Sequence, residues 1–166
     1  MSASTDRVAV LFVCLGNVCR SPTAEGVFRA QLIEAGLEHR IEVQSAGTGG
    51  HFAGRPPDPR AVTAAAARGF ELAGVAQRVP RDAFQRFDHV LAMDEENLAD
   101  LRRWPGARAE EAAELGLLLD ELPGAGRPRS VPDPFYGGAD GFERMLDLVE
   151  AGCAALLERI RRQYDW

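Results

Sequence analysis

The sequence predicts a single α/β domain in which a parallel sheet of about four strands carries helices on both faces. Two observations support this fold class. Short apolar segments rich in Val, Leu, Ile and Phe alternate along the chain with longer segments whose apolar residues recur every three or four positions. Strands that alternate with helices indicate a parallel sheet, because the chain must cross a face of the sheet between one parallel strand and the next.

The strand segments are short and apolar. The first is a run of six apolar residues, and the second alternates apolar with polar residues. The segment 109–122 is ambiguous, because its Ala and Glu content favours a helix whereas its leucines suggest an edge strand, which we favour. The predicted strands are residues 8–13, 41–45, 89–93 and 115–119.

The helical segments end where glycine or proline interrupts the apolar spacing. Two of them follow an aspartate that can cap the first turn, Asp58 before a proline and Asp94 after the third strand. The last and longest pattern has one apolar face, to which Cys153 belongs. The predicted helices are residues 23–35, 59–68, 81–87, 95–103 and 141–164.

Composition limits the functions that the chain can have. We assign all 166 residues to one domain and expect residues 1–6 to be disordered. A net charge of −6 argues against a general nucleic-acid binder, and three cysteines argue against a secreted disulfide framework. The apolar run near the N-terminus is too short for a signal peptide or a membrane span. We therefore expect a cytoplasmic protein without a membrane or nucleic-acid partner. The oligomeric state is left open between a monomer and a weak homodimer.

Residues 14–20 connect the first strand to the first helix and combine anion-binding groups with a nucleophile. Backbone N–H groups converge at such a turn, and the helix dipole adds partial positive charge there. Gly16 and Asn17 tolerate the positive φ angles that a concave loop needs, and Arg20 can hold two oxygens of a dianion. Cys14 would then lie beneath the anion, in a field that stabilises its thiolate.

The same loop has a simpler interpretation as a buried cysteine before an ordinary strand-to-helix turn. The Ser21 hydroxyl can cap a helix that begins at Pro22 under either interpretation. We favour the anion-binding loop because Cys, Gly, Asn, Arg, Ser and Pro all occur in register. Besides Cys14 and Arg20, the predicted binding residues of the loop are Leu15, Gly16, Asn17, Val18, Cys19 and Ser21.

Two stretches resemble motifs of the low-molecular-weight protein tyrosine phosphatases. VCLGNVCRSP at residues 13–22 resembles the signature C-x-x-x-x-x-R-S, and VPDPFYGG at residues 131–138 resembles the loop that carries the general acid in that family. By itself, an Asp-Pro pair in a segment rich in Gly and Pro indicates only a turn. The resemblance implies that Asp133 protonates the leaving group, and that Phe135 and Tyr136 form one wall of the site.

The resemblance also extends to residues that support the loop. It implies that the Asn17 side chain locks the loop and that the Ser21 hydroxyl donates a hydrogen bond to the Cys14 sulfur. The family often has a histidine after the second helix that bonds to the serine matched by Ser45. Residues 71–78 contain no histidine, so this hydrogen-bond network is expected to be smaller or differently satisfied.

The opposite wall is expected from the long loop 46–59 after the second strand. The family often has an aromatic residue there, and either His51 or Phe52 could face the site. Cys19 has two interpretations that we leave open. It is either a small buried loop residue or, by resemblance, a thiol that captures oxidised Cys14 as a disulfide.

Together the resemblances imply a metal-independent phosphatase without a cofactor that acts on phosphotyrosine through a phosphocysteine intermediate. The substrate would be a phosphotyrosine-containing protein, for which a bacterial tyrosine kinase is a candidate by family analogy. Arsenate reductases share the fold but need further cysteines. Phosphoarginine phosphatases favour Thr in place of Val18 and lack the aromatic pair. A phosphate-binding module would need neither a nucleophile nor an acid.

Overall fold

Four parallel strands form a sheet in the order β2-β1-β3-β4 in the computed structural model, which describes residues 7–135 and 137–166. The register of β1 on β2 aligns Cys14 with Gly47, so the loop after β1 begins level with the end of β2. The predicted fold class is confirmed. The strands are β1 (Val8–Cys14), β2 (Ile41–Gly47), β3 (His89–Ala92) and β4 (Glu114–Leu117).

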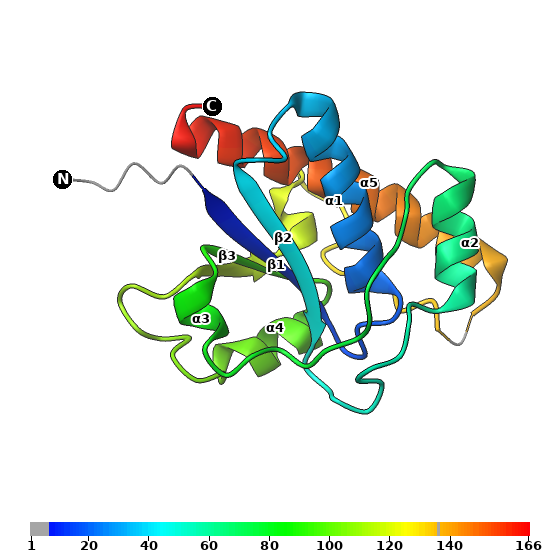
Figure 1. The fold of residues 1–166 in the computed structure, drawn as a ribbon, viewed down its shortest axis with the longest axis horizontal. Coiled ribbons are helices and arrows are strands. Elements are labelled where there is room, and N and C mark those ends of the chain that lie inside the picture. The colour runs from blue at the N-terminus through cyan, green and yellow to red at the C-terminus, as the bar shows by residue number, and fades with distance from the viewer. Residues whose placement is uncertain (1–6, 136) are drawn as a thin grey trace.

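Helices cover both faces of the sheet (Figure 1). One face carries α1 and α5, and α2 packs against α5. The other face carries α3 and α4. The helices are α1 (Arg20–Ala35), α2 (Pro59–Ala67), α3 (Ala83–Arg86), α4 (Glu95–Arg102) and α5 (Ala139–Tyr164).

Alternate residues of β1 point into two hydrophobic cores. Phe12 packs toward α1 and α5, and its ring meets Phe28 edge-on with 5.5 Å between the centroids. Leu11 and Val13 pack on the opposite side, toward α3 and α4. Because both faces of the strand are covered, almost every position of β1 is apolar. This double burial fixes the point from which the next loop starts.

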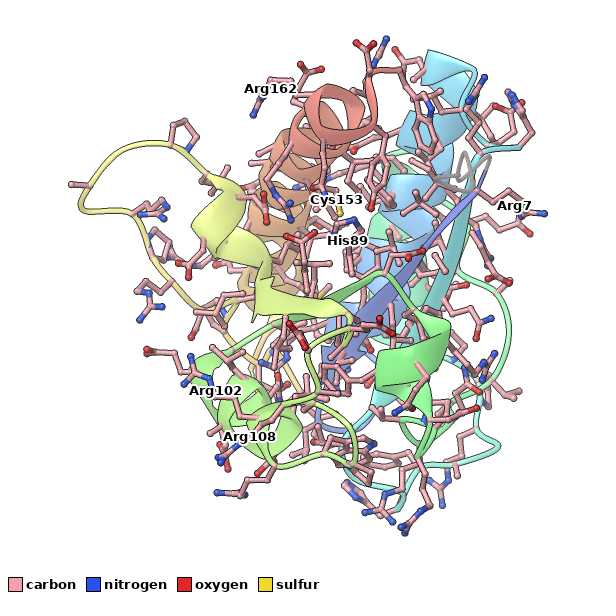
Figure 2. The ribbon with its side chains drawn as sticks, turned by 90° about the vertical axis from the view of Figure 1, so that its left-hand side faces the viewer. Arg7, His89, Arg102, Arg108, Cys153 and Arg162 are labelled. Atoms are coloured by element: carbon pink, nitrogen blue, oxygen red, sulfur yellow. The ribbon has the colours of Figure 1, made fainter. Side chains whose placement is uncertain are left out.

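The side chains separate clearly into interior and surface groups. In Figure 2, the exposed Arg7 and Arg162 lie at the edge of the molecule, whereas the buried His89 and Cys153 lie near its centre. Cys153 packs in the core between α5 and α1, as its place on an apolar helix face predicts. Within residues 7–135 and 137–166, no helix combines the length and the apolar character that a membrane span requires.

The predicted elements are present with shifted ends. Segment 109–122 contains β4 and then a short 3₁₀ helix, η1 (Leu118–Glu121), so the prediction of a strand is confirmed. Asp58 and Asp94 cap α2 and α4 through backbone N–H groups, also as predicted. Helix α1 begins at Arg20, earlier than expected. The expectation for residues 1–6 falls outside the described residues.

Candidate active site

The Cys14 loop lies where the strand order reverses. Its strand, β1, has β2 on one side and β3 on the other, so the connections that leave these strands diverge around the loop. Ligands in such sheets bind at this position, beyond the carboxyl ends of the strands. A cavity of about 150 Å³ opens there. It is lined by ten of the predicted site residues: Cys14, Leu15, Gly16, Val18, Cys19, Arg20, His51, Phe52, Asp133 and Phe135.

The backbone of the loop is concave, for reasons that were predicted only in part. Asn17 has a positive φ of 56°, as expected. Its backbone N–H donates to the Cys14 sulfur, with 3.3 Å between nitrogen and sulfur. Gly16 does not have a positive φ, so that prediction was wrong. A side chain at Gly16 would instead begin 2.7 Å from a carbon of the Phe52 ring, so glycine is needed there for close approach.

The start of helix α1 leaves several backbone N–H groups without an acceptor among the described residues. Among the described residues, no acceptor is found for the backbone N–H groups from Leu15 to Arg20, except that of Asn17. Cys19 occupies the N-cap position and makes no side-chain capping bond. The predicted cap by Ser21 was therefore wrong, because this residue already lies inside the helix. The unpartnered N–H groups remain available for an anion at the positive end of the helix.

Ser21 and Asn17 lie behind the cavity and hold the sulfur. The Ser21 hydroxyl is 3.0 Å from Cys14 Sγ, and Asn17 Nδ2 donates to Ser21 Oγ at 2.8 Å. Asn17 also donates to Ser45 Oγ at 3.0 Å. The Ser45 hydroxyl in turn donates to Glu25 Oε1 at 2.6 Å, so a carboxylate on α1 completes the network that lacks a histidine.

Sequence reasoning missed Glu25 as a site residue. The sequence signal for Glu25 was its spacing. Glu25 lies four residues after Ser21 and thus on the same face of α1 as that predicted site residue. The contact with Ser45 could not be predicted from this spacing, since it depends on how α1 packs on β2.

Two groups that do not line the cavity accept hydrogen bonds from Arg20. Its Nη1 donates to Asp94 Oδ2 at 2.6 Å and to the Val131 carbonyl at 3.0 Å, and its side chain is only 4% exposed. Burial alone would lower the pKa of Arg20, but the nearby Cys14 and Asp94 outweigh it and the pKa is raised. Asp94 therefore has a second role besides capping α4, because its other oxygen fixes the guanidinium.

Asp133 stands at the mouth of the cavity. Its side chain is 41% exposed, and Oδ2 lies 3.6 Å from Arg20 Nη2. Its Oδ1 accepts a hydrogen bond from the Phe135 N–H at 3.0 Å. Arg60 links this loop to the start of α2 by donating to the Phe135 carbonyl at 2.9 Å. A carboxyl group in this place can exchange protons with both a ligand and water.

Aromatic rings form part of the cavity wall. Phe52 stands between the other two rings, with its centroid 5.6 Å from that of Phe135 and 4.5 Å from that of His51. Both His51 and Phe52 line the cavity, whereas the sequence left open which of them would face it. Tyr136, the other predicted wall residue, lies outside the described residues.

The two further cysteines are buried thiols. Burial, followed by the charge of Asp58, raises the pKa of Cys19 to about 12. Burial also raises the pKa of Cys153, which does not line the cavity. All three cysteines are free, and the described residues include no cluster of three or more His, Cys, Asp and Glu that could hold a metal ion.

Comparisons with known proteins agree over nearly the whole chain. The family model described as low molecular weight phosphotyrosine protein phosphatase matches residues 9–165. A low molecular weight protein-tyrosine-phosphatase from Streptomyces coelicolor is 45% identical over 157 residues, covering 94% of this chain and 95% of the relative. The crystal structure of YfkJ from Bacillus subtilis aligns with a TM-score of 0.87 and 37% identity, covering 95% of this chain and 96% of that chain.

Structural similarity also extends to a phosphatase named for another substrate. The crystal structure of DARP, a Drosophila arginine phosphatase, aligns with a TM-score of 0.84 and 26% identity, covering 92% of this chain and 97% of that one. The family match and the relatives at higher identity nevertheless name the same family as the one that the motifs of the two loops resemble. The chain therefore belongs to the low molecular weight phosphotyrosine protein phosphatase family of enzymes.

Proposed function

We propose that the protein hydrolyses phosphotyrosine in other proteins, through a phosphocysteine intermediate and without a metal or cofactor. The observation that carries this proposal is the combination of Cys14 and an aromatic wall in one cavity. The rings of Phe52 and Phe135, 5.6 Å apart, offer flat apolar surfaces to an aryl group. The phosphate of such a substrate would enter the loop 14–20, where the free N–H groups and Arg20 meet.

In the first step, the Cys14 thiolate attacks phosphorus. A sulfur–phosphorus bond forms, the bond from phosphorus to the tyrosine oxygen breaks, and Asp133 gives its proton to the departing oxygen. In the second step, Asp133 takes a proton from water while the water oxygen attacks the phosphocysteine. Phosphate leaves and the thiolate is restored.

The charge that develops on the phosphoryl oxygens is met by groups already in place. Arg20 is buried and oriented by Asp94, and the backbone of the loop contributes N–H groups at the start of α1. Preorganised donors of this kind are often the largest single contribution to catalysis. They supply the positive charge that a metal ion supplies in other phosphatases, which is why we propose a metal-independent reaction.

Phosphoarginine is the second candidate substrate, because solved arginine phosphatases align with this chain at 26% identity. Val18 and the aromatic pair Phe135 and Tyr136 favour phosphotyrosine as the substrate. A resemblance to phosphoarginine phosphatases would instead imply Thr at position 18 and no aromatic pair. The substrate protein would be a bacterial tyrosine kinase or another protein that carries phosphotyrosine.

The test is to measure turnover of one peptide carrying phosphotyrosine, phosphoserine or phosphoarginine, in the presence of a metal chelator. We expect kcat/KM to be highest for phosphotyrosine, and the chelator to leave it unchanged. Cys14→Ser serves as the background control. A higher kcat/KM for phosphoarginine would overturn the substrate assignment, and loss of activity with the chelator would overturn metal independence.

A further inference from the structure

A chain of hydrogen bonds runs behind the catalytic cavity, from a carboxylate on α1 to the Cys14 sulfur. Glu25 Oε1 is 2.6 Å from Ser45 Oγ, which is 3.0 Å from Asn17 Nδ2. The same Nδ2 is 2.8 Å from Ser21 Oγ, and Ser21 Oγ is 3.0 Å from Cys14 Sγ. Hydroxyl and amide groups can often reverse their direction of donation. The direction of this chain is therefore set by two neighbouring groups that cannot reverse, the Glu25 carboxylate and the Gln77 backbone N–H.

Each of these two groups can take only one role in a hydrogen bond. The Glu25 carboxylate can only accept, so Ser45 must give it the hydroxyl proton and use its oxygen to accept from Asn17. The backbone N–H of Gln77 can only donate, and it donates to Asn17 Oδ1 at 2.9 Å. The amide of Asn17 is thereby oriented with its oxygen toward Gln77 and with both N–H bonds toward the serines.

This direction determines what Ser21 offers to the sulfur. Because Ser21 Oγ accepts from Asn17, its own proton is available for Cys14 Sγ at 3.0 Å or for the Ala46 carbonyl at 3.3 Å. A thiolate is the stronger acceptor because it is charged. If the chain ran the other way, Ser21 would donate to Asn17 and the sulfur would lose its hydroxyl donor.

Glu25 is itself firmly placed. Its other oxygen pairs with Arg29 Nη2 at 2.8 Å, and Arg29 Nη2 also donates to the Val43 carbonyl at 2.7 Å. The carboxylate is 16% exposed and faces a separate polar cavity of about 130 Å³, which Ser45 and Gln77 also line. Glu25 therefore lies outside the cavity that would hold the substrate.

We propose that Glu25 is a positioning residue that, together with the Gln77 backbone N–H, fixes the direction of this chain and so keeps the Ser21 hydroxyl donating to Cys14. The proposal rests on the proposed role of Cys14 as the nucleophile. Glu25 acts through three other side chains and makes no contact with the substrate. Its contribution is to hold the sulfur in the ionised form, in which it can attack phosphorus.

The test is the pH dependence of Cys14 alkylation by iodoacetamide, followed by tandem mass spectrometry to separate Cys14 from Cys19. Glu25→Leu removes the acceptor, and we expect the midpoint of the alkylation profile to move upward by about one pH unit. Glu25→Gln keeps an oxygen that can accept, so its midpoint should move upward by less. Glu34→Gln removes a charge from an exposed position of the same helix and should leave the midpoint in place.

The sign of the shift separates this proposal from a simple effect of charge. Loss of a negative charge near a thiolate stabilises the thiolate, so a through-space effect would move the midpoint downward in both Glu25 variants. An unchanged or lower midpoint in Glu25→Leu would overturn the proposal. In the Ser45→Ala background we expect Glu25→Leu to cause no further shift, and a full additional shift would also overturn it.

Alkylation does not depend on turnover, so the result also distinguishes the two proposals. If the wild-type protein failed to hydrolyse phosphotyrosine but Glu25→Leu moved the midpoint upward, the proposed function would fail and the positioning role would stand. If the enzyme were active and the midpoint did not move, only the role of Glu25 would fail.

Discussion

The two loops that meet at the cavity differ in how firmly they are held. In the Cys14 loop, Asn17, Arg20 and Ser21 are buried, and their side chains bond to fixed groups of the scaffold. In the Asp133 loop, the carboxylate is 41% exposed, and among the described residues it contacts a local backbone N–H and, at 3.6 Å, the Arg20 guanidinium. One loop is fixed before any ligand arrives, and the other stays open to water.

This difference suits two kinds of chemical work. Stabilising the charge of a transferred phosphoryl group requires donors that do not have to reorganise, so rigidity is useful. Delivering a proton and then accepting one from water requires a group that water can reach, so exposure is useful. We infer that variants of the first loop will damage phosphoryl transfer for every ester, whereas variants of the second loop will act selectively.

The largest effect is expected from Cys14→Ser. A serine hydroxyl is not ionised at neutral pH, so turnover should be abolished while the loop still binds an oxyanion. Steady-state assays with phosphotyrosine peptide and calorimetric titration with vanadate measure the two properties. Near wild-type activity in this variant would remove Cys14 from the nucleophile role.

Arg20→Lys should have the next largest effect. An ammonium group cannot reproduce the planar fork, nor can it bond to Asp94 and an oxyanion in the same geometry. We expect kcat/KM to fall by about 10²–10³-fold or more for any aryl phosphate. Arg102→Lys, at an exposed position on α4, is the matched control and should stay near wild type. Activity within about threefold for Arg20→Lys would mean that the backbone holds the anion.

Arg60→Gln tests the anchorage of the second loop. Arg60 pairs with Asp58 and donates to the Phe135 carbonyl, so it joins α2 to the loop of Asp133. We expect kcat to fall by at most about fivefold, because exposed ion pairs contribute little, and vanadate affinity to stay the same. A loss of vanadate affinity as large as the loss of kcat would show that the two loops are not separable.

Cys19→Ser concerns recovery from oxidation instead of rate. The pKa of about 12 keeps Cys19 protonated at neutral pH, so peroxide should first oxidise Cys14 to a sulfenic acid. Attack by Cys19 sulfur would then expel water and form a disulfide, which thiol reductants reverse. We expect wild type to regain activity after mild peroxide and Cys19→Ser to regain much less, each relative to its own untreated sample. Equal recovery would make Cys19 a structural residue.

The two loops also differ in how much of them could be predicted from sequence. Cys14 to Arg20 are consecutive, so their chemistry could be inferred locally, and Asp133 required the resemblance because an Asp-Pro turn is common. The cap assigned to Ser21 was wrong because a local pattern cannot show that the helix keeps its first N–H groups free.

Other contacts depend on the packing of distant segments. Ser45 and Gln77 meet Asn17, and Glu25 meets Ser45, only because α1 and the segment after α2 both pack against β2. The need for glycine at position 16 likewise comes from Phe52, which lies on another loop. Such contacts become visible only when the strand order is known.

We infer that the Cys14 loop stabilises the transferred phosphoryl group whereas the Asp133 loop transfers protons. The most direct test of this inference is single-turnover phosphorylation of Cys14 in wild type and Asp133→Asn, with phosphotyrosine and with p-nitrophenyl phosphate. We predict that Asp133→Asn slows the reaction of phosphotyrosine by ~10²–10⁴-fold, and that of p-nitrophenyl phosphate much less, because nitrophenolate departs without needing a proton. The basic limb of the pH–rate profile should also disappear. Equal slowing of both esters with that limb retained would contradict the account and place the general acid elsewhere.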